Sequence, residues 1–152
     1  MAIILIMDDD VVLAEGWAEI LRDAGHQVDT AANASDALDY ALGRDVDLVI
    51  TDIFVRDEHG QPLPDGGLRL IGTLMAKKHS PEHPWLKHLG VMAVSGSARL
   101  SGGGDPLAMA EAVGAHVVLE KPLSWEVLVA NVAMLLARMA RKRSGAAGAA
   151  AV

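Results

Sequence analysis

The 152-residue sequence predicts an α/β fold in which a five-stranded parallel sheet is sandwiched between helices. Short apolar runs alternate along the chain with segments of helical periodicity. These runs are continuous, which is typical of parallel strands buried on both faces. Hydrophobic residues make up 51% of the chain but aromatic residues only 3%, so aliphatic side chains must fill the core. The length fits a single domain.

The first part of the chain contains three expected strands and two helices. Residues 2–7 are an apolar, β-branched run, and a helical pattern follows at Leu13, Trp17, Ile20, Leu21 and Ala24. Gly25 is expected to end this helix, because helix C-termini favour a residue that tolerates positive φ. Strands are expected over 28–32 and 46–51, with Ser35 as the N-cap of the short helix between them.

The second part adds two strands and three helices. The expected elements are a long loop over 56–66, helices over 67–78 and 107–113, and strands over 90–94 and 116–119. Ser124 is expected to cap a final helix from Trp125 to about Arg143, whose last turn is rich in cations that suit a helix C-terminus. Residues 144–152 are rich in Ala and Gly and are expected to be a disordered tail.

Charge and composition exclude several classes of function. The net charge of −7 argues against nucleic acid as a partner, because phosphate contacts need clustered Lys and Arg. The absence of Cys excludes disulfides, thiolate metal sites and a cysteine nucleophile. No apolar stretch approaches the roughly 18 residues of a membrane span, and no basic start indicates a signal peptide. We therefore expect a cytoplasmic protein that does not bind membranes.

Polar residues follow four of the expected strands and form a chemically consistent set. Asp8 and Asp9 follow the first strand, Asp52 the third, Ser95 the fourth and Lys121 the fifth. In a parallel sheet such residues meet at the carboxyl edge, where ligands bind. Clustered carboxylates repel one another unless a cation compensates, and Mg²⁺ prefers oxygen ligands. A carboxylate with a metal ion, a lysine and a hydroxyl suits phosphoryl transfer through an aspartyl phosphate.

This ordered set resembles the receiver domain of two-component response regulators, in the single-domain form typical of chemotaxis regulators. The resemblance covers about residues 3–139 and implies a flavodoxin-like sheet of order 2-1-3-4-5. It also implies a receiver domain over residues 1–143 with no output domain. The implied partners are a histidine kinase or a histidine phosphotransfer protein, together with a downstream protein target.

The resemblance also assigns roles to individual residues. Asp52 matches the phosphoacceptor, and Asp8, Asp9, Asp52 and the backbone carbonyl of Phe54 match the ligands of Mg²⁺. Lys121 matches the residue that pairs with the phosphoryl group, Ser95 the hydroxyl that moves toward it, and Gly96 the small residue that lets it approach. The Lys121–Pro122 bond is implied to be cis. The chemistry implied is self-catalysed phosphotransfer from phosphohistidine, followed by autodephosphorylation.

Three features depart from the family pattern. The Asp65-Gly66 pair lies 13 and 14 residues after Asp52, farther along than is usual, so the loop after Asp52 is enlarged. A second enlargement, with glycines at 102–104, follows Ser95. Val118 stands where the family often has an aromatic switch residue, which puts the usual coupling of the hydroxyl to that residue in question.

Two other functions remain as alternatives. A receiver fold can act as an interaction module without phosphorylation, and Val118 and the enlarged loops favour that interpretation. Residues 8–12 also fit the D-x-D-x-[TV] motif of haloacid-dehalogenase-like phosphohydrolases, in which Asp8 would be the nucleophile. Those enzymes place an acidic motif after the lysine, whereas here only Glu126, within a helix, follows Lys121.

Overall fold

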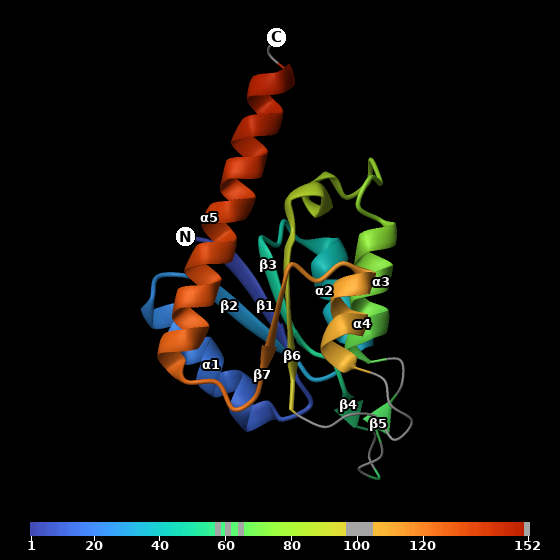
Figure 1. Cartoon of the computed structure of the whole chain (residues 1–152), viewed down its shortest axis with the longest axis vertical. Helices are drawn as coiled ribbons and strands as arrows, with labels where there is room; N and C mark the ends of the chain where they lie inside the picture. Colours follow the sequence, from blue (N-terminus) through green and yellow to red (C-terminus); the bar gives the residue numbers. More distant parts are fainter. Residues whose placement is uncertain (57–58, 60–61, 64–65, 97–104, 151–152) are drawn as a thin grey trace.

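The centre of the computed structural model, which describes residues 1–56, 59, 62–63, 66–96 and 105–150, is a five-stranded parallel sheet. The strand order is β2-β1-β3-β6-β7 (Figure 1), which confirms the predicted order 2-1-3-4-5. The strands are β1 (Ile3–Met7), β2 (Gln27–Ala31), β3 (Leu48–Asp52), β6 (Gly90–Ser95) and β7 (Val117–Glu120). A separate antiparallel pair, β4 (Val55–Arg56) and β5 (Pro62–Leu63), lies in the segment predicted as a loop.

Helices cover both faces of the sheet. Figure 1 shows α1 (Val11–Asp23) and α5 (Trp125–Ala150) on one face, and α2 (Ala34–Gly43), α3 (Gly67–Ala76) and α4 (Pro106–Val113) on the other. A short 3-10 helix, η1 (Pro84–His88), precedes β6. In β1, Ile4 and Ile6 face the α1/α5 layer, whereas Leu5 and Met7 face the other layer. All four side chains are fully buried, which explains the continuous apolar run.

Side-chain caps fix the starts of several helices, although α3 begins without one. The Leu13 N–H donates to the Asp10 carboxylate at the start of α1, over 3.1 Å. At α5 the Val127 N–H donates to the Ser124 hydroxyl over 3.2 Å, as predicted. The predicted cap of α2, Ser35, is wrong: Asn33 accepts the Asp36 N–H over 2.8 Å, and the helix begins two residues earlier than a Ser35 cap requires. Both residue types cap helices well, so the sequence alone did not separate them.

Helix α5 is longer than the sequence indicated. The prediction ended it near Arg143 and made residues 144–152 a disordered tail, but the backbone of α5 continues to Ala150 and projects beyond the sheet (Figure 1). Alanine has the highest helix propensity, and a helix that already exists needs no new nucleus to extend. The compositional signal for disorder was therefore outweighed by local propensity. Among the described residues, no helix combines the length and the hydropathy that crossing a bilayer requires.

Candidate functional site

Three carboxylates meet at the carboxyl edge of the sheet. β1 pairs with β3 so that Met7 lies opposite Thr51, and the next residues of the two strands, Asp8 and Asp52, therefore emerge side by side. Asp8, Asp9 and Asp52 each offer an oxygen, and these oxygens lie within 4.8 Å of one another. Asp8 is 1% exposed and Asp52 is 7% exposed. The pocket thus concentrates negative charge where water is scarce.

Lys121 brings a positive charge to this cluster from the end of β7. Its Nζ lies 2.7 Å from Asp8 Oδ2 and 3.5 Å from Asp52 Oδ2. The backbone holds the residue in place, since the Lys121 N–H donates to the Ser95 carbonyl over 2.7 Å. The Lys121–Pro122 peptide is cis, as the resemblance implied. Residues more than 100 positions apart in the chain, such as Asp8 and Lys121, therefore form one ion-pair network.

The acid–base properties of the pocket are set by burial and by the ion pairs of Lys121 with Asp8 and Asp52. Burial raises the pKa of Asp52 to about 6, against the charge of Lys121 and with the help of Asp8. Burial also raises the pKa of Asp8, although the hydrogen bond from Lys121 opposes the shift. Burial works to lower the pKa of Lys121, but its hydrogen bond to Asp8 and the charge of Asp52 outweigh that effect, and the pKa is raised. The pocket therefore favours additional positive charge.

The remaining predicted site residues surround this network. The Phe54 N–H donates to Asp52 Oδ1 over 3.3 Å, which orients the carboxylate. Ser95 is 3% exposed and follows Val94, the register partner of Asp52, so it lies at the same edge of the sheet. A Cβ at Gly96 would lie 3.7 Å from Lys121 Cδ, which is an ordinary contact. Gly96 is therefore beside Lys121, and the protein itself would leave room for a methyl group there.

The sequence analysis missed one residue that shapes the site, Gly67. A Cβ at this position would lie 1.9 Å from the Asp52 carbonyl oxygen and 2.9 Å from Ile53 Cα. The Gly67 N–H also donates to the Ile53 carbonyl over 3.1 Å. The start of α3 thus packs directly on the backbone that carries Asp52. Two consecutive glycines at a helix start were the available signal, but the Asp65-Gly66 pair drew the interpretation to Gly66.

The departures from the family pattern are only partly covered by the structure. Most of the enlarged loop after Asp52, and residues 97–104 after Ser95, lie outside the described residues. Val118 is partly buried in β7 and packs against the core beneath α2, α3 and α4. Val118 thus places a partly buried aliphatic side chain where the family often has an aromatic switch residue.

The fold is thus a doubly wound α/β domain with an acidic, lysine-bridged pocket at the carboxyl edge of its sheet. The family model of the response regulator receiver domain matches residues 4–133. The chain belongs to this family, the receiver domains of two-component systems. Comparison with curated protein sequences gave no match.

Solved structures support the same fold. A CheY-like receiver domain protein from Methanospirillum hungatei is 23% identical, with a TM-score of 0.74 over 93% of this chain and 98% of that one. A putative response regulator from Chloroflexus aurantiacus is 27% identical, with a TM-score of 0.69 over 90% of this chain and 98% of that one. NtrX from Brucella abortus is 30% identical, with a TM-score of 0.74; the match covers 95% of this chain but only 29% of NtrX.

Proposed function

We propose that this receiver domain accepts a phosphoryl group from a phosphohistidine on Asp52, in a reaction that depends on Mg²⁺. The observation that carries the proposal is the cluster of three carboxylates with oxygens within 4.8 Å of one another, two of which, Asp8 and Asp52, are bridged by the Lys121 ammonium. The proposed donor is a histidine kinase or a histidine phosphotransfer protein, in the cytoplasm. The phosphorylated domain would then signal or relay the group through contacts with a downstream protein.

The donor set fits Mg²⁺. Carboxylate oxygens are the ligands that this ion prefers, and it commonly uses one or two of them together with phosphate oxygens. Burial raises the pKa values of Asp52 and Asp8, so a bound cation would stabilise the ionised form of both carboxyls. Asp8, Asp9, Asp52 and the Phe54 carbonyl would hold the ion, which when bound supplies positive charge to the phosphoryl oxygens.

In the proposed phosphoryl transfer, Asp52 is the nucleophile and three neighbouring residues assist it. An oxygen of ionised Asp52 forms a bond to phosphorus while the bond between phosphorus and the donor histidine nitrogen breaks, and the electron pair stays on that nitrogen. The Lys121 ammonium faces Asp52 Oδ2 and would pair with the phosphoryl oxygens as their charge shifts. Ser95 would donate its hydroxyl to the attached group, and Gly96 would leave room for its approach. Hydrolysis breaks the new P–O bond with water and returns the carboxylate.

The pH dependence of Mg²⁺ binding tests the charge balance of the pocket. Because the pKa of Asp52 is about 6, this carboxyl is mainly protonated at pH 5 and mainly ionised at pH 7. Binding of the ion at low pH must displace that proton, so we expect the affinity to be about tenfold weaker at pH 5 than at pH 7. Isothermal titration calorimetry at the two pH values measures the difference. Asp52→Asn should remove most of it, and equal affinities at both pH values would contradict the prediction.

The phosphoacceptor is tested directly with acetyl phosphate and Mg²⁺, with mass spectrometry of the intact chain as the readout. The wild-type protein should gain one phosphoryl group, and Asp52→Asn should gain none. Asp47→Asn is a matched control, because Asp47 lies just before β3, at the opposite end of the strand that Asp52 closes; it should be modified like the wild type. Beryllofluoride with Mg²⁺ should give a saturable response in the wild type and in Asp47→Asn, but not in Asp52→Asn.

The same experiment separates the alternatives. A wild-type protein that neither gains a phosphoryl group nor responds to beryllofluoride would favour a phosphorylation-independent interaction module. Turnover of p-nitrophenyl phosphate that is lost in Asp8→Asn but retained in Asp52→Asn would favour a phosphohydrolase. In the structure both Asp8 oxygens are engaged, one with Lys121 Nζ over 2.7 Å and one with the Asp10 N–H over 2.9 Å. The Asp52 oxygens are held over longer distances, 3.3 Å from the Phe54 nitrogen and 3.5 Å from Lys121 Nζ, which favours Asp52 over Asp8 as the nucleophile.

A further inference from the structure

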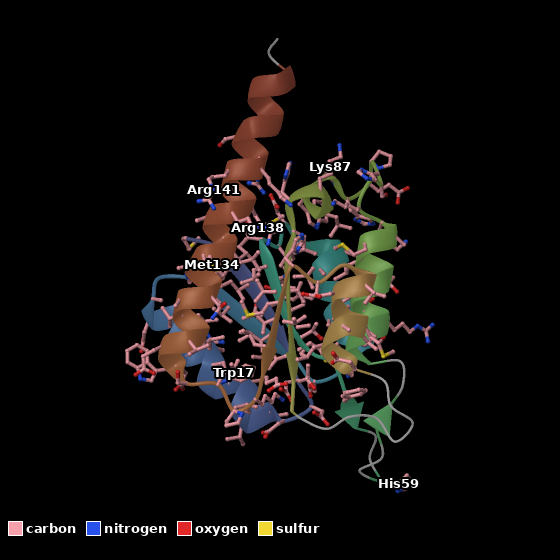
Figure 2. The ribbon with its side chains drawn as sticks, in the orientation of Figure 1. Trp17, His59, Lys87, Met134, Arg138 and Arg141 are labelled. Atoms are coloured by element: carbon pink, nitrogen blue, oxygen red, sulfur yellow. The ribbon has the colours of Figure 1, made fainter. Side chains whose placement is uncertain are left out.

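Trp17 lies directly beside the site without belonging to the predicted set of functional residues. It is on the inner side of α1, its side chain is 6% exposed, and Figure 2 shows it at the end of the molecule where α1 begins. The centroid of its ring is 5.8 Å from Lys121 Nζ. This distance is within the range in which an ammonium is attracted to the face of an indole.

Lys121 Nζ therefore lies between charged carboxylates and an aromatic ring. Asp8 lies 2.7 Å away and Asp52 lies 3.5 Å away, and the Trp17 ring is the third neighbour. A lysine has a flexible four-carbon stem and a point charge that hydrogen-bonds in many directions. Two carboxylates alone would allow the ammonium to move between them and toward water. A large, buried ring next to the ammonium restricts that movement and excludes water from one side of it.

We infer that Trp17 is a positioning residue for Lys121, holding the ammonium at the place where the phosphoryl group on Asp52 would need it. This inference rests on the proposed function of Asp52. The contact of Trp17 at the site is with the Lys121 ammonium, so its effect passes through Lys121. It belongs at the same time to the core between α1, α5 and the sheet, together with Leu128 and Leu135. The test must therefore separate positioning from packing.

The first readout follows the Lys121 side chain in the absence of any phosphoryl donor. In the wild type, NMR of the side-chain Cε and its protons should show a ring-current shift from the indole. Trp17→Leu should abolish this shift, and Trp17→Phe, which keeps an aromatic ring and is the safer variant for folding, should retain part of it. A Lys121 spectrum identical in wild type and in Trp17→Leu would overturn the inference, whether or not Asp52 is phosphorylated.

The second readout is the rate of phosphorylation by acetyl phosphate. Trp17→Leu should slow it about 3–10-fold, with Trp17→Phe intermediate, as expected for loss of a cation–π contact. The affinity for Mg²⁺ should change less than twofold, because the metal-binding carboxylates are untouched. If the wild type is phosphorylated and Trp17→Leu is phosphorylated at the same rate, the inference about Trp17 fails while the proposed function of Asp52 stands. No phosphorylation of the wild type would overturn the proposed function and leave the NMR test decisive for Trp17.

Trp85→Leu is the matched control for lost packing. Trp85 is also a large aromatic residue, and its indole N–H donates to the Ala41 carbonyl over 2.9 Å, but it packs against the α2/α3/α4 side of the sheet. Its replacement should lower stability and leave the phosphorylation rate and the Lys121 spectrum unchanged. If it slows phosphorylation as much as Trp17→Leu does, the effect of Trp17 is packing and the inference fails.

Discussion

Replacement of Lys121 with Met should lower the stability of the metal-free protein by about 2–4 kcal/mol at pH 7.5, because it leaves buried carboxylates without their cation. The Lys121 side chain is only 17% exposed, and its partners Asp8 and Asp52 are 1% and 7% exposed. Methionine keeps most of the apolar stem, so the loss is mainly electrostatic. Urea unfolding in the presence of a chelator measures it.

The sign of the pH dependence identifies the cause. The pKa values of Asp8 and Asp52 are raised in the folded protein, so the folded state binds protons more tightly than the unfolded chain does. Ionisation of Asp52 therefore costs stability as pH rises from its ordinary pKa of 3.8 to its folded pKa of about 6, and the cost is fully present above that pH; Lys121→Met removes the charge that limits it. The loss should be much smaller at pH 5, and Mg²⁺ should restore part of it at pH 7.5.

Lys87→Met is the control for removing a lysine as such. Lys87 is exposed and lies at the opposite end of the molecule (Figure 2). Its replacement should change stability by less than about 0.5 kcal/mol at either pH. A Lys121→Met variant that loses the same free energy at pH 5 and pH 7.5 would show that the stem, and not the charge, stabilises the fold.

Gly67→Ala should be the most disruptive single-methyl change near the site. The added Cβ would lie 1.9 Å from the Asp52 carbonyl oxygen and 2.8 Å from its carbonyl carbon, and neither backbone atom can rotate away. Either the start of α3 or the segment bearing Asp52 must move. We expect a loss of at least about 2 kcal/mol in unfolding free energy, together with weaker Mg²⁺ binding.

Gly72→Ala provides the comparison within the same helix. Gly72 lies in α3, and a Cβ there would have no atom within 4 Å. This variant should gain up to about 1 kcal/mol, because alanine favours a helix more than glycine does. Chemical denaturation of the two variants side by side gives opposite signs if the contact with Asp52 controls the effect; equal changes would mean that helix propensity alone decides it.

The sequence was sufficient to predict the strands of the sheet and the ionic residues at its carboxyl edge. Strands buried on both faces are apolar throughout, so Asp8, Asp52 and Lys121 stand out where the strands end, and parallel pairing brings those ends together. The sheet order came from the resemblance to receiver domains. The roles of these residues remain predictions that the proposed experiments test.

The features that were missed or misjudged depend on distances between segments that pattern analysis cannot supply. Gly67 matters because the Asp52 backbone lies against it, and Trp17 because the Lys121 ammonium lies beside its ring. Periodicity correctly placed Trp17 on the buried side of α1 but could not identify this neighbour. The N-cap at Asn33 was decided by a small difference in local free energy between two nearby candidates, whereas α5 runs on from its predicted end near Arg143 to Ala150 because alanine favours the helix.

The continuation of α5 past the sheet offers a helical attachment point for a second protein module. An α-helix turns by about 100° and rises by about 1.5 Å for each residue. A second helical module fused in phase with the last turns of α5 would therefore take an orientation set by the number of inserted residues. A series of variants with one to several inserted residues would place the fused module at different angles around the axis of α5, so that the orientation of a fused reporter domain could be chosen.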